Sequence, residues 1–187
     1  FKHLVLSPHS TRKKFLRLFD NEIELARSGK KAEVFLKMNS LVDEELIEKM
    51  YEAGKAGVKI RAIVRGICAL IPGVKGLSEN IEIISIVDRL LEHSRVFFFR
   101  NGGETLCYIS SGDWMARNLD SRIEISCPIY AQGIQKELLN MLEIQWNDNT
   151  KARMVDAAQQ NLHRTSGSKK KVRAQDAIYS YLSAGKK

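Results

Sequence analysis

The chain has 187 residues, of which 44% are hydrophobic and 28% charged, with three cysteines and a net charge of +8. A chain of this size buries roughly 70% of its unfolded surface, so its core needs neither metal ions nor disulfides. The composition excludes a disulfide-rich secreted module, and no apolar run reaches the ~18 residues of a membrane-spanning helix. An odd number of widely spaced cysteines indicates reduced, mostly buried thiols and a cytosolic setting.

The positive charge is concentrated at the carboxyl end of the sequence. Residues 151–187 contain nine Lys or Arg and two Asp, so they carry +7 of the total +8 and leave the first 150 residues near neutral. Such an arm attracts polyanions. The sequence starts at a Phe with no signal-peptide pattern, and we expect it to be cut from a longer polypeptide.

The first predicted elements alternate between helix and strand. Helical spacing of apolar residues predicts a helix over about 11–28 with Ser10 as its N-cap, followed by a strand over 32–38. A second helix over 43–55 leads to a strand over 58–64. A strand, helix, strand order favours parallel pairing of the two strands.

The residues that follow predict further strands, including an antiparallel hairpin. A strand over 81–87 precedes two strands over 95–99 and 105–110, which flank the turn signal at 101–103. Another strand is predicted over 122–129.

Two helices complete the prediction. The first covers 133–147, and a Ser/Gly/Lys linker over 163–171 precedes the second at 174–182. The apolar side chains that we expect the first of these helices to bury are Ile134, Leu138, Leu139, Leu142, Ile144 and Trp146. The predicted fold class is α/β: a mixed sheet flanked by helices, with a basic helical tail.

Arg65 is the first candidate site residue. It follows a buried strand and precedes Gly66, which lets backbone and ligand approach closely. Ligands of open α/β sheets bind at this rim, and guanidinium groups fork onto phosphate oxygens. The alternative is an ordinary ion pair with a nearby acid.

His93 is the second candidate, two residues before Arg95. On an extended chain the two side chains share a face, so they can present an imidazole and a cation to one phosphate. The alternative is a histidine that only completes the hydrogen bonds of a turn.

Glu124 is the third candidate. Strand alternation places it with Arg122 on one face, opposite Ile123 and Ile125. A strand glutamate within reach of a histidine can orient the imidazole and hold its proton. A solvent-facing Arg/Glu pair is the alternative.

Several well-known motifs are missing. The sequence contains no GxxxxGK[ST], GxGxxG or HExxH segment, which argues against a Walker-type nucleotide site and a zincin. The basic run at 169–173 is too short to indicate specific nucleic-acid recognition.

Six segments in consistent order resemble one family, the type 1 polyphosphate kinases. They read LKMNSLVD at 36–43, VRGIC at 64–68, SIVDRLLEH at 85–93, DWMARN at 113–118, RIE at 122–124 and KVRAQ at 171–175. The resemblance runs from near Ser7 to the end of the chain. The matched segments belong to the carboxyl-terminal part of the proteins of this family.

The resemblance implies two phospholipase-D-like domains that face each other, of which this chain is the second. Residues 1–38 would end the preceding domain or form the junction, 39–150 would be the phospholipase-D-like domain, and 151–187 the basic tail. It implies reversible transfer of the ATP γ-phosphate to inorganic polyphosphate through a phosphohistidine outside the chain. We therefore expect the isolated chain to be inactive.

The resemblance also implies roles for residues. Arg65 matches a nucleotide-phosphate-binding arginine, His93 a second active-site histidine that contacts those phosphates, and Glu124 a glutamate beside that site. ATP or ADP and polyphosphate are the implied substrates, and the Mg²⁺ ligands would lie outside the chain. The implied partners are the other domains of the polypeptide and further copies in a homo-oligomer. The implied location is cytoplasmic, with peripheral membrane association left open.

The chain departs from the HxKxxxxD motif of phospholipase-D-like hydrolases. Arg95 stands at the lysine position and Arg100 at the aspartate position. Both replacements argue against a diesterase and suit a site for a dense polyanion. Two alternatives stay open: a non-catalytic polyanion or nucleic-acid binding module, and a diverged phospholipase-D-like diesterase.

Overall fold

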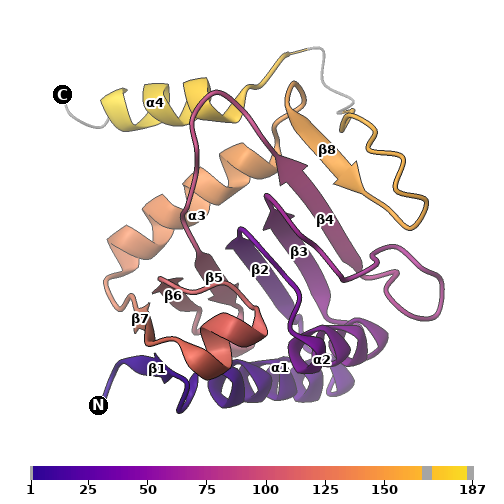
Figure 1. The fold of residues 1–187 in the computed structure, drawn as a ribbon, viewed down its shortest axis with the longest axis vertical. Coiled ribbons are helices and arrows are strands. Elements are labelled where there is room, and N and C mark those ends of the chain that lie inside the picture. Colours follow the sequence, from indigo (N-terminus) through magenta and orange to yellow (C-terminus); the bar gives the residue numbers. More distant parts are fainter. Residues whose placement is uncertain (1, 166–169, 185–187) are drawn as a thin grey trace.

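A computed structural model describes residues 2–165 and 170–184. Its centre is an eight-stranded sheet with the strand order β1-β7-β6-β5-β2-β3-β4-β8 (Figure 1). The strands are β1 (Val5–Ser7), β2 (Glu33–Met38), β3 (Lys59–Val64), β4 (Ile81–Ile86), β5 (Val96–Phe99), β6 (Leu106–Ser110), β7 (Glu124–Pro128) and β8 (Ala152–Val155). The helices are α1 (Thr11–Arg27), α2 (Glu44–Lys55), α3 (Gln132–Trp146) and α4 (Ala174–Ala184), with a 3₁₀ turn η1 (Asn101–Gly103) and a π-helical turn η2 (Arg117–Ser121).

The centre of the sheet is parallel, as the strand, helix, strand pattern predicts. Strand β2 pairs with β3 from Glu33 opposite Lys59 to Met38 opposite Val64, and β3 pairs in parallel with β4. The carboxyl ends of the three strands therefore lie at one edge, toward which their arrowheads point in Figure 1.

The other half of the sheet is antiparallel. Strand β5 runs against β2 with Val96 opposite Lys37, and β6 and β7 continue the alternation. The start of β5, the end of β6 and the start of β7 therefore lie at the same edge as the ends of β2, β3 and β4. This edge, called the rim below, carries the loops at 39–43, 65–70, 87–95 and 111–116.

The predicted hairpin between β5 and β6 is confirmed. Its turn is η1, in which Asn101, Gly102 and Gly103 adopt φ values of 49°, 69° and 113°. Glycine takes such left-handed conformations without the steric cost of a Cβ atom, and asparagine tolerates them better than most residues. The Asn-Gly-Gly segment therefore allows the chain to reverse here.

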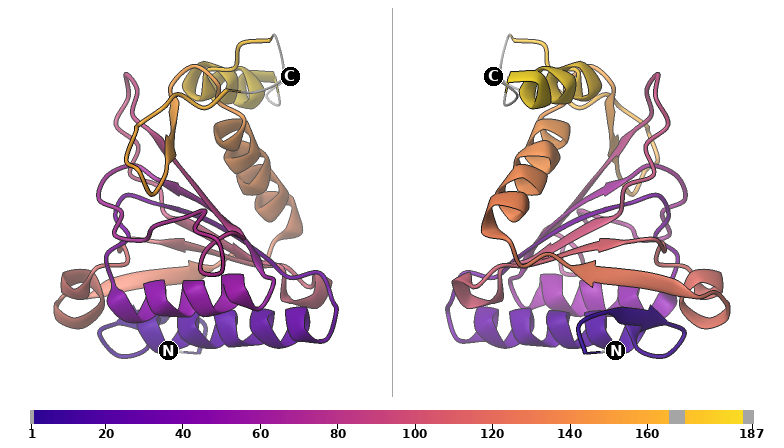
Figure 2. Two further views of the ribbon diagram at one scale, coloured as in Figure 1. Left: turned by 90° about the vertical axis from the view of Figure 1, so that its right-hand side faces the viewer. Right: turned by 90° about the vertical axis from the view of Figure 1, so that its left-hand side faces the viewer.

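Helices cover both faces of the sheet (Figure 2). Helices α1 and α2 lie side by side on one face, and α3 lies on the other. Under α1 the Phe15 ring packs at 5.1 Å from Phe97 and 5.4 Å from Trp114. Under α3 the Phe35 ring lies 5.6 Å from Trp146. None of the described helices combines the length and apolarity needed to span a bilayer.

Ser10 stands at the N-cap of α1, as expected, although its hydroxyl bonds the backbone of Leu6 and makes no side-chain cap. The expectation for α3 is wrong at one position. Helix α3 buries Leu142 and Trp146 but leaves Ile134 exposed, because only its second half is covered well by the sheet. The start of α2 agrees with expectation, since the Asp43 carboxylate accepts a hydrogen bond from the Leu46 N–H.

The cysteines are free thiols, and Cys107 is fully buried while Cys68 and Cys127 are half-buried. Burial raises the pKa of Cys107 to about 12 and that of Cys68 to about 11. Both are therefore protonated and unreactive near neutral pH.

The expected tail is partly built into the fold. The sequence does not predict β1 or β8, yet β8 pairs antiparallel with β4. Some of the basic side chains of the tail are directed at the protein: Arg173 pairs with Asp88, and Arg164 lies 4.6 Å over the Trp146 ring. Part of the expected linker, 166–169, lies outside the described residues, as do Phe1 and 185–187.

The expected domain boundaries stay predictions about the longer protein. Within this chain, residues 5–38 contribute β1, α1 and β2 to the same sheet and core as the residues that follow.

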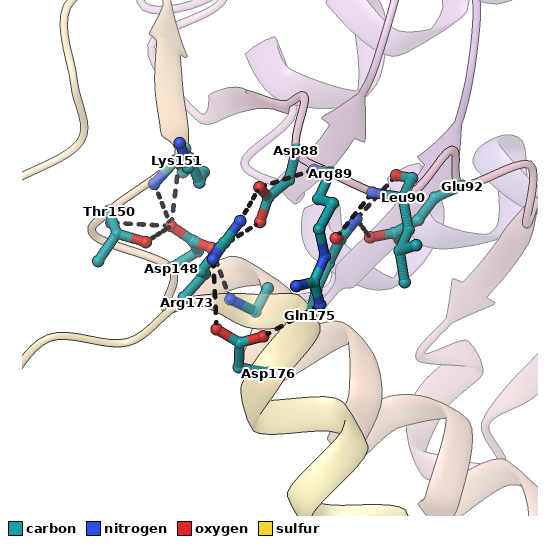
Figure 3. A network of polar contacts seen from close by, with 12 residues as sticks. Asp88, Arg89, Leu90, Glu92, Asp148, Thr150, Lys151, Arg173, Gln175 and Asp176 are labelled. Atoms are coloured by element: carbon teal, nitrogen blue, oxygen red, sulfur yellow. Dashed lines mark hydrogen bonds and ion pairs between the residues drawn. The ribbon is translucent and has the colours of Figure 1, made fainter.

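Asp148 holds the start of β8 and the start of α4 together. Its buried carboxylate accepts hydrogen bonds from the backbone N–H groups of Thr150 (2.8 Å), Lys151 (2.7 Å), Ala152 (3.1 Å) and Ala174 (2.6 Å). Burial by itself raises the pKa of Asp148, but these donors outweigh it and the pKa lies below its ordinary value. Figure 3 shows Asp148 beside Lys151 and Arg173.

We expect the chain to lose stability in acid through Asp148 and Asp88. The pKa of Asp88 is lowered to about 2, mainly by hydrogen bonds from Arg173. Both carboxyl groups bind protons more weakly when folded, so their contribution is complete above the ordinary Asp pKa of about 4 and is lost as the pH falls toward 2. Urea unfolding at pH 7, 4 and 3 measures the decline. The Asp148→Asn variant should have a lower free energy of unfolding at pH 7, and this free energy should decline less steeply as the pH falls. A decline as steep as that of the unmodified chain would contradict the assignment.

Candidate functional site

The first part of the site joins the ends of β2 and β3 at the rim. Arg65 follows β3, and its Nε donates a 2.9 Å hydrogen bond to the Oδ1 of Asn39, which follows β2. The Gly66 N–H donates to the Asn39 carbonyl at 2.8 Å. A Cβ atom at Gly66 would lie only 3.0 Å from that carbonyl oxygen, so glycine allows this close approach. Arg65 is half-buried, with one guanidinium edge held by Asn39.

Asp113 connects these residues to the start of β5. Its Oδ1 accepts hydrogen bonds from the Asn39 N–H (2.8 Å) and the Arg95 Nε (3.1 Å), and its Oδ2 accepts from the Arg95 Nη2 (3.0 Å). Burial raises the pKa of this carboxyl group, but the hydrogen bonds from Arg95 and Asn39 outweigh it and the pKa is lowered. Asp113 is therefore a buried anion with both oxygens occupied.

His93 lies in the loop that leads into β5, and its side chain is exposed. The loop is tied to the rim because the His93 carbonyl accepts a 2.7 Å hydrogen bond from the Arg95 Nη1. Among the described residues, no hydrogen bond to the imidazole is present. The ring is accessible to a ligand at the rim.

Arg95 does not act as the sequence suggests. The expected His-x-Arg pair would present imidazole and guanidinium together, but the guanidinium forms a two-point ion pair with Asp113. The positively charged group of Arg95 is therefore directed toward Asp113 inside the protein. Arg95 connects the His93 loop to Asp113 and Asn39.

Glu124 lies at the start of β7 beside the loop after β6. Its carboxylate accepts hydrogen bonds from the Asn118 Nδ2 (2.7 Å) and from the Ser111 hydroxyl. Within the described part of the chain, no hydrogen bond joins Glu124 to His93. A Cβ atom on Gly112 would lie 3.0 Å from the Glu124 side chain, so Glu124 packs against the loop that carries Asp113.

The expected alternation along β7 is confirmed. Ile123 and Ile125 are exposed side chains, with 85% of Ile123 accessible, while Glu124 is half-buried and Ser126 is buried. Glu124 and Ser126 therefore face the protein, whereas Arg122, just before the strand, is exposed.

Lys37 and Glu92 were missed by the sequence analysis. Lys37 in β2 is buried, and its Nζ contacts the Glu92 carboxylate and donates to the Gln145 Oε1 at 2.6 Å. Burial lowers the pKa of Lys37 although Glu92 opposes the effect. A lysine within the apolar run 34–38 was the available signal, because lysine is almost never fully buried without a partner. Asn39 and Asp113 were also missed, although each follows a strand that ends at the rim.

The structure thus links two predicted residues through one hydrogen-bonded path, Arg65–Asn39–Asp113–Arg95–His93. Glu124 supports the loop in the middle of this path. We call the rim residues Arg65, His93 and Glu124, with Asn39 and Asp113, the candidate site. An exposed imidazole and a half-buried guanidinium at the same rim suit an anion, and charge-assisted hydrogen bonds from both groups favour phosphate oxygens.

Divalent cations fit this site poorly. The described residues hold no cluster of three or more His, Cys, Asp or Glu that could bind a metal ion. The two carboxylates of the site already accept hydrogen bonds from Arg95, Asn39, Asn118 and Ser111. A cation would have to displace these donors.

The fold is that of the phospholipase D class. The Nuc protein of Salmonella typhimurium, a phospholipase D family member, superimposes with a TM-score of 0.61 over 82% of this chain and 97% of Nuc, at 14% identity. The family profile described as "Polyphosphate kinase C-terminal domain 2" matches residues 4–175. The chain belongs to this family.

The chain is also similar to proteins named polyphosphate kinase. The polyphosphate kinase of Vibrio vulnificus is 50% identical over 182 residues, and that of Escherichia coli K12 is 43% identical; each alignment covers 97% of this chain and 26% of the relative. The crystal structure of polyphosphate kinase from Porphyromonas gingivalis superimposes with a TM-score of 0.94 at 42% identity, over 99% of this chain and 28% of that chain. The chain thus spans about a quarter of the length of these relatives.

Proposed function

We propose that this chain is the nucleotide- and polyphosphate-binding part of a polyphosphate kinase. The whole enzyme would transfer the ATP γ-phosphate reversibly to inorganic polyphosphate through a phosphohistidine outside the chain. The observation that carries the proposal is the hydrogen-bonded path that holds Arg65 and His93 at one rim. Membership of the polyphosphate kinase C-terminal domain family supports the proposed reaction.

Arg65 is proposed to neutralise charge on the phosphates of the nucleotide. Phosphoryl transfer spreads negative charge over the oxygens of the transferring group, so fixed cations contribute much of the catalysis. The Nε of Arg65 is occupied by Asn39, which leaves the outer edge of the guanidinium for phosphate oxygens. Because Asn39 is itself bonded to Asp113, the guanidinium is oriented before the ligand arrives.

His93 is proposed to hydrogen-bond a transferring or bridging phosphate oxygen and to assist proton transfer. A ring nitrogen of an imidazole can donate a hydrogen bond to a phosphate oxygen or accept a proton from it. Glu124 is proposed to act on this site through the 110–113 loop. Its contacts with Asn118 and Ser111 support it as a positioning residue.

The phosphohistidine is proposed to lie in another domain of the longer protein. The Mg²⁺ ligands are proposed to lie there too, since the carboxylates of this site are occupied by Arg95, Asn39, Asn118 and Ser111. Mg²⁺ would neutralise phosphate charge during the reaction. We propose a cytoplasmic enzyme that forms homo-oligomers.

The isolated chain is expected to neither make polyphosphate nor become phosphorylated on histidine. The full-length protein, incubated with γ-labelled ATP under the same conditions, should do both. Acid-labile and base-stable label separates phosphohistidine from phosphoester. Label on any histidine of the isolated chain would contradict the assignment of the phosphohistidine to another domain.

The function itself is tested in the full-length enzyme by ATP-dependent polyphosphate synthesis. Turnover near that of the unmodified enzyme after loss of both Arg65 and His93 would overturn the proposed roles.

A further inference from the structure

Two segments that are far apart in the sequence meet in the structure. Asp88 and Glu92 lie in the loop before β5, which also carries His93, while Arg173 and Gln175 lie at the start of α4. They are more than 80 residues apart in the chain, yet Figure 3 shows their side chains in one polar network.

The first contact of this network is an ion pair. The Arg173 Nε donates to the Asp88 Oδ2 at 2.8 Å and the Nη2 donates to the Oδ1 at 2.6 Å. The Asp88 side chain is only 2% exposed. A bidentate arginine–carboxylate pair fixes direction as well as distance.

The second contact pairs a side-chain amide with a peptide unit. The Gln175 Nε2 donates to the Leu90 carbonyl at 2.8 Å, and the Leu90 N–H donates to the Gln175 Oε1 at 3.0 Å. The same Nε2 reaches the Glu92 Oε1 at 3.1 Å, while the other Glu92 oxygen contacts Lys37. Gln175 therefore holds the loop directly before His93.

Apolar burial does not hold this loop. Val87, Leu90 and Leu91 are 66%, 59% and 69% exposed, and residues 87–95 belong to neither helix nor strand. Loops with few buried apolar contacts open easily. The position of His93 thus depends on polar contacts, from Arg95 on one side and from α4 on the other.

We propose that the start of α4 is a clasp that positions His93, with Gln175 as the positioning residue and the Arg173–Asp88 pair as its anchor. The inference rests on the proposed function, since it assumes that His93 acts on phosphate. Helix α4 is itself anchored, because Ala174 donates to Asp148 and the Tyr181 hydroxyl accepts from the Asn140 amide at 3.0 Å. The carboxyl-terminal helix is in this way connected to the site.

The test is Gln175→Leu in the full-length polyphosphate kinase, which keeps a side chain of similar size and removes all three hydrogen bonds. We expect kcat for polyphosphate synthesis to fall about 10-fold or more, since small displacements of a reacting group are costly. Hydrogen exchange in residues 87–95 should accelerate. Ser180→Ala is the matched control: it removes the hydrogen bond from the Ser180 hydroxyl to the Asp176 carbonyl within α4 but leaves the loop contacts, and it should change neither quantity.

A double variant separates a positioning role from a general loss of structure. In a His93→Ala background, Gln175→Leu should cause no further loss of activity, whereas independent structural damage would multiply the two losses. Multiplicative losses, or unchanged kcat and exchange in Gln175→Leu, would overturn the clasp. If His93→Ala alone leaves activity unchanged, the proposed function of His93 fails instead.

Discussion

Alanine at Arg65 or at His93 is expected to reduce ATP-dependent polyphosphate synthesis by the full-length enzyme by about 10²- to 10³-fold, the usual effect of removing one preoriented donor from a charged transition state. Both residues lie at the rim, where His93 is exposed and the half-buried Arg65 is oriented by Asn39. Because the guanidinium of Arg95 is engaged by Asp113, it does not replace either lost group.

Conservative variants distinguish charge from geometry. Arg65→Lys keeps the cation but loses the planar fork that contacts Asn39 and phosphate together, so it should recover only part of the activity. Arg17→Ala and His9→Ala remove exposed side chains of the same types in and near α1, and they should behave like the unmodified enzyme. Steady-state synthesis rates at saturating ATP and polyphosphate provide the comparison. Equal losses in the control variants would point to a nonspecific effect.

Asp113→Ala is expected to lower the free energy of unfolding by about 3–5 kcal/mol, because it leaves the Arg95 guanidinium unpaired in a largely buried place. It also removes the acceptor of the Asn39 N–H. The path between Arg65 and His93 is interrupted at the same time. Activity should therefore fall even at temperatures where the variant stays folded. Urea unfolding at pH 7 gives the stability.

The matched control for this prediction is Asp120→Ala. Asp120 also pairs with an arginine, Arg12, but it is exposed, and exposed ion pairs contribute little to the free energy of unfolding. A loss below 1 kcal/mol for Asp113→Ala, or equal losses for the two variants, would contradict the central place of Asp113 in the site.

Elements with strong periodic patterns were predictable. Helices α1 and α2, the parallel strands β2, β3 and β4 and the β5–β6 hairpin lie close to their expected positions. The short strands β1 and β8 were not predicted, since three or four residues carry too little alternation to be recognised. Both become strands by pairing with β7 and β4, which is a tertiary effect.

The candidate site was predictable where residues stand at strand ends. Arg65 directly follows β3, and β2, β3 and β4 end at one edge of a parallel sheet, so its location at the rim could be inferred. The hydrogen-bonding partners of the site residues could not be inferred from the sequence. Arg95 was expected to face a ligand, but the loop after β6 places Asp113 beside it.

The sequence by itself determined the periodic elements, the family and the residues that end at the rim, because these depend on local spacing and on motifs within short segments. Only the tertiary structure decided which polar groups are paired. Asn39 meets Asp113 across 74 residues, and Asp88 meets Arg173 across 85. Such pairs depend on strand order and on where loops cross the sheet, and no local pattern encodes either. That physical reason explains why Arg65 and His93 were found in the sequence while the contacts that hold them were not.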